Sequence, residues 1–252
     1  MQSMSWIAAG LFLPLFPMSM VFNLVFQRVT SAWLRIILLV IWPLPGLWIV
    51  QNVSFEISNG LLYWALFTAV LYAFRSAVIR ELSVWTGFIA TSSWSLTWVA
   101  LFNGAKADDL LMHVFAFSIP LILLAILVAR LERQYESAYA GVVAGLAQEQ
   151  PRMTGILVVV MLAVIGTPLF PSFFTLLHAI NNVIVIIPLV AFALVLIWLI
   201  WSWSGVRLLQ ELIVGTPAVQ QHEDIGHGMT LFYSILFVLL VVSGLYISEV
   251  LL

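Results

Sequence analysis

Cysteine is absent from this 252-residue sequence, and charged residues are scarce. Without thiols the chain forms neither disulfides nor thiolate metal sites. Charged residues make up 8% of the sequence, whereas about 25% is typical of soluble globular domains. The net charge of −2 gives no sign of nucleic-acid binding, which relies on an excess of Lys and Arg. These absences argue against a soluble domain, a disulfide framework and a nucleic-acid-binding module.

Apolar residues dominate instead. They make up 63% of the sequence, and the mean hydropathy is +1.14. Charged residues cluster between long apolar runs rather than spreading along amphipathic faces. The N-terminus shows no basic leader with a small-residue cleavage site, so we expect the first apolar run to be retained. We therefore predict an all-α integral membrane protein, with residues 1–252 forming a single polytopic domain in a lipid bilayer.

Eight apolar runs meet or approach the roughly 20 residues that a helix needs to cross a bilayer. They lie near residues 5–26, 32–51, 60–79, 84–103, 109–130, 153–170, 178–203 and 229–251. Residues 171–205 also allow a second interpretation, in which a short half-helix precedes a full span. The sequence therefore predicts a bundle of eight transmembrane helices, or nine under the second interpretation.

The positive charges predict an orientation. With eight spans, only Lys106 lies on one side of the bilayer, and eight arginines lie on the other: Arg28, Arg35, Arg75, Arg80, Arg130, Arg133, Arg152 and Arg207. Positive residues concentrate in cytoplasmic loops. We therefore expect both termini outside the cytoplasm and the chain in a bacterial cytoplasmic membrane. An additional crossing by a half-helix would move Arg207 to the other face.

The segment from Gly166 to Phe174 interrupts an apolar stretch at membrane depth. Pro168 and Pro171 each remove a backbone donor and clash with the preceding helical turn. In lipid, backbone groups freed in this way need protein partners or a water-filled cavity. The pattern predicts a broken helix near residues 166–174, and broken helices commonly line ion or substrate paths in transporters.

His113 follows Lys106 and two aspartates and lies about one helical turn inside the fifth apolar run. An ionisable side chain at this depth is costly and indicates an ion-path residue, because imidazole exchanges protons near neutral pH. The alternative is a neutral histidine at the interface, hydrogen-bonded to a neighbouring helix. The sequence leaves both interpretations open.

His178, Asn181 and Asn182 follow the broken segment directly. They are candidates to face a hydrated cavity, where they would relay protons or coordinate a cation. Polar side chains also join helices in membrane bundles by hydrogen bonds, which is the alternative. The break beside them favours the cavity, because its backbone groups need water or polar partners.

Other polar residues receive structural interpretations. Arg75 is expected to snorkel to the interface. His222, Glu223, Asp224 and His227 match no metal-binding spacing, and a solvated loop is expected there. Most of the eleven tryptophans are expected in interfacial aromatic belts. We expect no cofactor and no metal site.

Several short motifs follow one another in a recognisable order from Arg80 onward. They are Arg80-Glu-Leu-Ser at a helix start, His113-Val-Phe-Ala-Phe117, Ala144-Gly-Leu-Ala-Gln-Glu-Gln-Pro151, Gly166-Thr-Pro168, Ser172-Phe-Phe-Thr-Leu176, Trp203-Ser-Gly-Val-Arg207 and Gly215-Thr-Pro217. In this order they resemble the C-terminal half of the antiporter-like subunits of respiratory complex I, Mrp-type antiporters and inorganic-carbon accumulation complexes. The resemblance covers residues 60–252, and residues 1–59 would be additional N-terminal spans.

The departures from this family bear on mechanism. The resemblance implies a proton path built on lysines near the bilayer midplane, and Leu82, Phe117 and Leu176 occupy the matching lysine positions. Only His113 persists among them, with His178 as a nearby substitute. The N-terminal half, with the family's glutamate–lysine pair, is mostly absent. The resemblance therefore indicates a truncated, diverged member that keeps the scaffold and at most one half-channel.

Three functions remain as hypotheses. The first is a non-enzymatic accessory subunit of a proton- or sodium-translocating complex, packed beside a full-length antiporter-like subunit and soluble or peripheral partners. Its polar lining would be His113, His178, Asn181 and Asn182. The second is a structural membrane anchor for a peripheral catalytic subunit. The third is a stand-alone carrier, which would normally show a second broken segment, and the prolines of the first two runs are a faint candidate for it.

Overall fold

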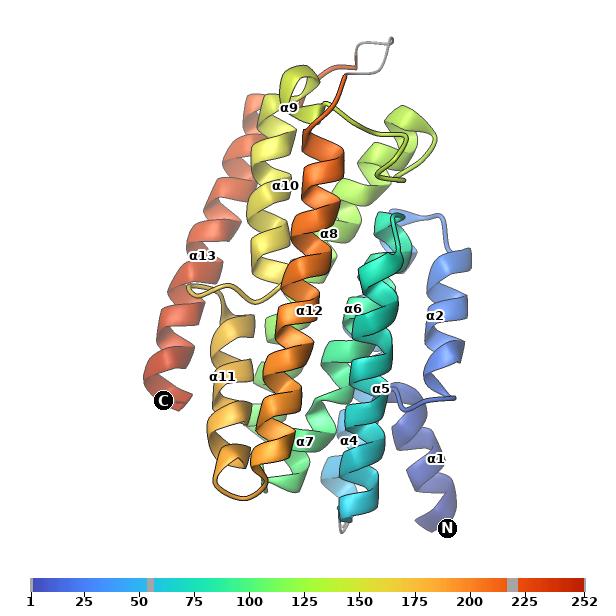
Figure 1. Cartoon of the computed structure of the whole chain (residues 1–252), viewed down its shortest axis with the longest axis vertical. Coiled ribbons are helices and arrows are strands. Elements are labelled where there is room, and N and C mark those ends of the chain that lie inside the picture. Colours follow the sequence, from blue (N-terminus) through green and yellow to red (C-terminus); the bar gives the residue numbers. More distant parts are fainter. Residues whose placement is uncertain (1, 54–56, 217–221, 252) are drawn as a thin grey trace.

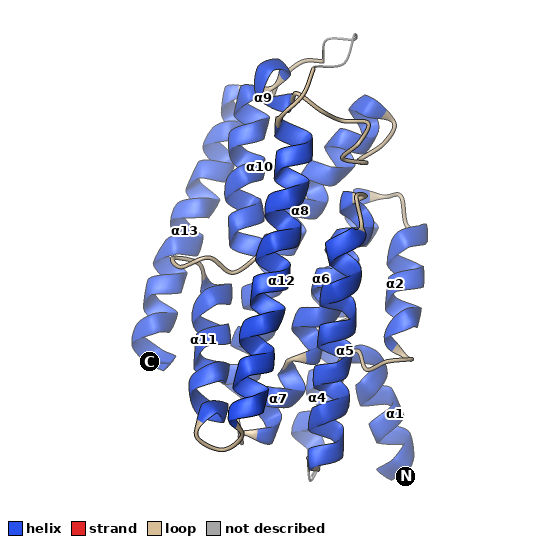
Figure 2. Ribbon diagram, viewed as in Figure 1, coloured by secondary structure: helices blue, strands red, loops and turns tan. Residues whose placement is uncertain are grey.

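A computed structural model describes residues 2–53, 57–216 and 222–251, and within these ranges the fold is helical throughout. The helices lie side by side along the long axis of the molecule (Figures 1 and 2). They are α1 (Gln2–Phe12), α2 (Ser19–Arg28), α3 (Ala32–Ile41), α4 (Pro43–Asn52), α5 (Asn59–Val78), α6 (Leu82–Ser95), α7 (Thr97–Phe102), α8 (Ala107–Tyr135), α9 (Leu146–Glu149), α10 (Pro151–Val164), α11 (Pro171–Ile184), α12 (Pro188–Ile213) and α13 (His227–Leu251).

Five helical segments of the described chain are long and apolar enough to cross a membrane. They are residues 32–52 (α3 with α4), α5, α8, α12 and α13. The predicted count of eight or nine spans is not confirmed, because the runs near 5–26, 84–103 and 153–170 are each interrupted. A turn separates α1 from α2, Leu96 separates α6 from α7, and α10 ends after 14 residues.

The second interpretation of residues 171–205 describes the local structure better than the first. A half-helix, α11, ends at Ile184, and the long α12 starts at Pro188 after a short turn. Figure 1 shows α11 continuing below α10 and α12 returning upward beside both. Because α10 stops partway along the bundle, α11 continues in the same direction, and the two together extend along the bundle as one longer helix would. Arg207, near the end of α12, therefore lies at the same end as the other arginines.

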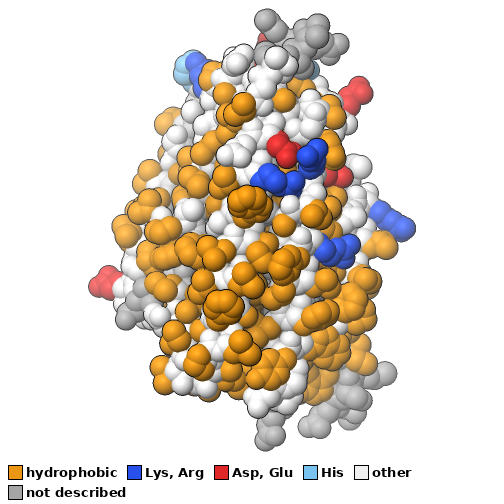
Figure 3. Space-filling model, in the orientation of Figure 1, with side chains coloured by type: hydrophobic (Ala, Val, Ile, Leu, Met, Phe, Trp, Pro, Cys, Tyr) orange, Lys and Arg blue, Asp and Glu red, His pale blue; other side chains and the backbone are white. Residues whose placement is uncertain are grey.

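The arginines gather at one end of the bundle, where α5, α8 and α12 end and α10 and α13 begin (Figure 1). Arg80 and Arg207 both approach Glu211, at 3.5 Å and 3.8 Å. Lys106 lies at the opposite end, as the N-cap residue of α8. On the face drawn in Figure 3, charged side chains lie mainly over the upper half, above a broad apolar surface. Which end faces the cytoplasm stays a prediction.

Four tryptophans lie in the core, so the expectation of interfacial belts is wrong for them. Each indole N–H has an acceptor: Trp85 donates to Ser204 Oγ, Trp94 to Ser118 Oγ, Trp98 to the Leu13 carbonyl and Trp201 to Ser92 Oγ, at 3.0–3.1 Å. Because serines and a freed carbonyl satisfy the polar atom, these large rings fill the centre of the bundle without an unpaired donor. Trp33, Trp48 and Trp203 remain exposed.

Candidate functional site

The helix that begins at Pro151 ends at Val164 and resumes at Pro171, where the sequence predicts a break. Gly166 adopts the left-handed φ of +69°, which is available to glycine at no steric cost. Pro168 lies inside the break and contributes no backbone N–H. Pro171 occupies the first turn of α11, where a missing N–H costs nothing.

Protein groups satisfy the carbonyls that the break frees. Trp198 Nε1 donates to the carbonyls of Ile165 and Gly166, at 3.1 Å and 2.9 Å. Ser172 Oγ donates to the Ala163 carbonyl at 2.7 Å, and Thr167 Oγ1 donates to the Leu162 carbonyl at 3.0 Å. Side-chain donors therefore stabilise the backbone of the break within the protein.

Two glycines let neighbouring helices approach this break. A Cβ at Gly244 of α13 would collide with the Leu169 carbonyl, and a Cβ at Gly205 of α12 would lie 2.6 Å from Ile165 Cγ2. Real Cβ atoms essentially never approach this closely. The helix α13 therefore packs directly against the interrupted backbone, and α12 packs closely against the side chain of Ile165.

A small cavity lies beside α11, near the Lys106 end, and several polar side chains line it although most of its surface is apolar. Its volume is about 30 Å³, enough for about two water molecules. The lining comes from α7, α8, α11 and the end of α13: Ala100, Asn103, Ala105, Asp109, His113, Thr175, His178, Ala179, Asn182 and Leu251. The structure thus brings His113, His178 and Asn182 together, although the two histidines are 65 residues apart along the chain.

His113 is 3% exposed, and its Nε2 lies 3.0 Å from the Ser93 carbonyl. A carbonyl only accepts, so Nε2 carries the proton and Nδ1 is left as an acceptor. The Ser93 carbonyl, next to the interruption at Leu96, also accepts from the Leu96 backbone N–H at 3.2 Å. The ring lies against Phe117, with 5.2 Å between ring centroids. His113 therefore ties α8 to the α6–α7 joint.

His178 is hydrogen-bonded through both ring nitrogens. Nδ1 lies 2.8 Å from the Leu251 carbonyl, and Asn182 Nδ2 lies 2.8 Å from Nε2. The carbonyl requires a proton on Nδ1, and the amide N–H requires an acceptor at Nε2. The arrangement therefore fits a neutral imidazole that holds the end of α13 against α11.

Asn181 does not join this group. It is exposed on the surface of α11 and is not among the cavity residues. Asn103, which the sequence analysis did not single out, takes its place in the lining. Both polar atoms of its side-chain amide are buried and lack a hydrogen-bond partner in the described chain. The Asn103-Gly104 turn before the acidic start of α8 was the available signal.

Buried apolar side chains occupy the three positions that the resemblance described above matches to lysines. Leu82, Phe117 and Leu176 are 0%, 1% and 2% exposed. Phe117 also packs edge-on against Trp201, with 5.6 Å between ring centroids.

The histidine-rich loop before α13 has structural contacts rather than a solvated conformation. His222 bonds Glu149 Oε1 through its backbone N–H and Nδ1, at 2.7 Å and 3.0 Å. Asp224 accepts from the backbone N–H groups of Arg152 and Met153 and thereby caps α10. Within the residues described, no group of three or more possible ligands could hold a metal ion. Pro217 lies outside the described residues.

Hydrogen bonds from this loop change the pKa of one carboxyl group, that of Glu149. Burial raises the pKa of the Glu149 carboxyl, but the hydrogen bonds from His222 outweigh burial, so the pKa is lowered below its ordinary value. The charged form of Glu149 is therefore part of what holds the loop to α9.

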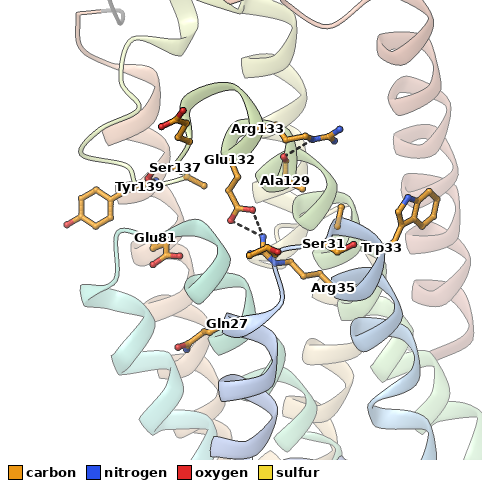
Figure 4. A pocket seen from close by; sticks show the side chains of 14 residues that line it. Gln27, Ser31, Trp33, Arg35, Glu81, Ala129, Glu132, Arg133, Ser137 and Tyr139 are labelled. Carbon is orange, nitrogen blue, oxygen red and sulfur yellow. Dashed lines mark hydrogen bonds and ion pairs between the residues drawn. The ribbon is translucent and has the colours of Figure 1, made fainter.

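A larger cavity of about 790 Å³ lies at the arginine end, and Figure 4 shows the side chains that line it. Arg35 enters from α3 and binds both oxygens of Glu132 on α8, at 2.9 Å and 2.8 Å. Arg133, Glu81 and Glu136 also line the cavity. Arg35 is 4% exposed, so this ion pair is largely buried. Hydropathy does not reveal pairing between distant helices, so the sequence alone does not predict this ion pair.

Comparisons with known proteins support the membrane fold. No family model matches the chain. A relative from Aquifex aeolicus (strain VF5), described as an uncharacterized protein, is 23% identical over 217 residues, covering 85% of this chain and 88% of the relative.

Solved structures of two respiratory assemblies contain similar chains. One is respiratory complex I from Thermus thermophilus, with a TM-score of 0.77 and 17% identity over 95% of this chain and 54% of the other. The second is the membrane-bound sulfane sulfur reductase, an archaeal respiratory membrane complex, with a TM-score of 0.79 and 15% identity over 94% of this chain and 51% of the other. This chain spans about half the length of those chains and is similar to them in fold.

Proposed function

We propose that this chain is a non-enzymatic membrane subunit of a proton- or sodium-translocating complex, packed beside a full-length antiporter-like subunit. The observation that carries the proposal is the small cavity that brings His113 and His178 together beside a broken helix in an apolar bundle. Ionisable groups at membrane depth are costly and commonly mark ion paths. The similarity in fold to chains of respiratory membrane complexes supports the same assignment.

The chain would supply one segment of the path that ions take across the membrane, and the partner subunit would supply the rest. The unpaired amide of Asn103 and the free Nδ1 of His113 are suited to holding water in the cavity. Toward the arginine end, Phe117 and Leu176 close the bundle. Asn181 and Asn182 are exposed beside the cavity, so the partner subunit would meet this chain there and continue the path.

The proposed topology has eight crossings. The five long segments supply five of them. The pairs α1 with α2, α6 with α7, and α10 with α11 would supply three more, each as two shorter helices in succession. An even number of crossings places both termini on one side, and the arginine end then faces the cytoplasm of a bacterial cell.

A stand-alone carrier is less well supported. The turn between α1 and α2 supplies a second interruption, as such a carrier would require. However, Trp98 and Trp64 donate to the carbonyls of Leu13 and Phe16, and Thr68 Oγ1 accepts from the Phe16 N–H. A carrier needs free backbone groups at its breaks to bind the solute, and side chains occupy these.

A structural anchor is the second candidate, and the hydrogen bonds of the histidines favour it. His113 and His178 each bond a backbone carbonyl of another helix, as packing residues would. The anchor would hold a peripheral catalytic subunit against the membrane without carrying ions.

Substitution of the two histidines separates these candidates. In the assembled complex, His113→Gln and His178→Gln keep a polar side chain but remove proton exchange. The path proposal predicts at least a tenfold loss of ion-coupled activity with the complex intact on native gels. His227→Gln is the matched control, because His227 lies at the opposite end of the bundle, next to Arg152. Full activity in both cavity variants would rule out the path and leave the anchor.

A further inference from the structure

A groove on the edge of the bundle runs between α2, α5 and α6, and its volume is about 440 Å³. Figure 1 shows α2 at the periphery, beside these two helices. Arg28 and Arg75 line the groove together with the aromatic rings of Tyr72 and Phe88. Two guanidinium groups therefore share one open groove near the arginine end.

The charge of this groove is not neutralised within the described chain. No carboxylate is among its lining residues, and neither arginine forms an ion pair with a described residue. Other arginines of the same end differ, because Arg35 binds Glu132, and Arg80 and Arg207 share Glu211. The groove thus carries two positive charges that are available to a ligand.

Aromatic contacts hold one of these charges in place. The Arg75 guanidinium carbon lies 4.8 Å from the centre of the Phe88 ring and 5.5 Å from that of Tyr72. Cation–π contacts at these distances are attractive. Arg75 therefore does more than extend toward the interface, which was the expectation from sequence.

Along α2 the groove carries two apolar side chains in addition to the polar Asn23 and Gln27. Met20, Leu24 and Arg28 repeat at intervals of four residues on α2, so they lie on one face of that helix. Met20 and Leu24 also line the groove and are about half exposed. A helix rises 1.5 Å per residue, so this face extends roughly 12 Å from the arginine into the apolar part of the surface.

We propose that this groove binds an anionic phospholipid, with its phosphate between Arg28 and Arg75 and an acyl chain along Leu24 and Met20. Basic pockets between membrane helices suit anionic headgroups. Free phosphate would satisfy the arginines but would leave the apolar face uncovered. The combination of charge above and apolar surface below therefore selects a lipid.

Lipid binding to the purified protein tests this inference. The full chain, delipidated in mild detergent, is titrated with phosphatidylglycerol or with phosphatidylcholine of the same acyl chains, and native mass spectrometry counts the adducts. We expect a preference for phosphatidylglycerol that the Arg28→Gln/Arg75→Gln double variant loses. At roughly fivefold per arginine, affinity should fall about 25-fold. Arg133→Gln is the charge-matched control at the same end and should retain the preference.

A second variant distinguishes the contribution of cation–π stacking to lipid binding from that of charge alone. Arg75→Lys keeps the charge but fits the two rings less well, so we expect it to weaken binding less than the double variant does. Circular dichroism would establish that each variant keeps its helix content. Equal phosphatidylglycerol binding by wild type and double variant would overturn the proposal. So would loss of an associated subunit from the double variant in native membranes without any change in lipid binding, since the arginines would then serve a protein partner.

Discussion

At the scale of single residues, polar side chains within the bundle form hydrogen bonds or ion pairs with groups on other helices. His113 reaches the Ser93 carbonyl, His178 reaches the Leu251 carbonyl, and Arg35 reaches Glu132. Each bond joins segments that are at least 20 residues apart in the sequence. Because an unpaired buried donor or charge is expensive, each pair restricts which helices can be neighbours.

The Arg35–Glu132 pair should be the most sensitive of these to substitution. Arg35→Met leaves the Glu132 carboxylate without its partner, and removal of one member of a buried pair costs about 3–5 kcal/mol. Glu132 is 24% exposed, so partial solvation lowers our expectation to about 2–4 kcal/mol. Thermal unfolding in detergent measures the loss, and Arg133→Met should change stability much less. A combined Arg35→Met/Glu132→Leu variant that is no more stable than either single variant would argue against this pairing.

At the scale of elements, helix breaks are easier to predict from the sequence than contacts between helices are. Pro168 and Pro171 indicate the α10–α11 interruption because proline affects its own helix. The cavity could not be assembled in the same way, since it combines Asn103, His178 and a carbonyl from the last turn of α13. Likewise, hydropathy does not distinguish a tryptophan in the core, such as Trp201, from one facing lipid, such as Trp203.

The α10–α11 break depends on a close approach by α13. Gly244→Ala places a Cβ against the Leu169 carbonyl, and overpacking of this kind costs about 1–3 kcal/mol. Gly228 lies on the same helix with no atom within 4 Å of an added Cβ, so Gly228→Ala should be neutral or stabilising by up to about 1 kcal/mol. Unfolding midpoints in detergent compare the two variants. Equal unfolding midpoints for the two variants would show that α13 does not pack closely against the α10–α11 break at Gly244.

The loop before α13 should release from α9 in acid. A carboxyl with a lowered pKa stabilises the fold above its ordinary pKa, about 4.3, and this contribution disappears as pH falls through the lowered pKa. Glu149→Gln should therefore reduce the unfolding midpoint near pH 7, and its difference from wild type should shrink as the pH falls below about 4. A difference that stays constant between these pH values would mean that Glu149 acts by packing alone.

At the scale of the whole molecule, an arginine-rich end, an apolar middle and a histidine-lined cavity near the other end divide the bundle. The segregation of arginines was predictable, because charge near span ends is visible in the sequence. The interruption between α6 and α7 at Leu96 was not predictable, because apolar length alone conceals a helix break that contains no proline. In the proposed account, the arginine-rich end fixes the orientation of the chain in the membrane. The partner subunit contacts the surface beside the histidine-lined cavity.

The most direct measurement is purification of the tagged chain from its native membranes in mild detergent, followed by mass spectrometry of the proteins that co-elute. The account predicts a full-length antiporter-like subunit in stable association, together with soluble or peripheral subunits whose identity would name the coupled reaction. Recovery of this chain alone, as a monodisperse oligomer, would contradict the account and favour a stand-alone carrier.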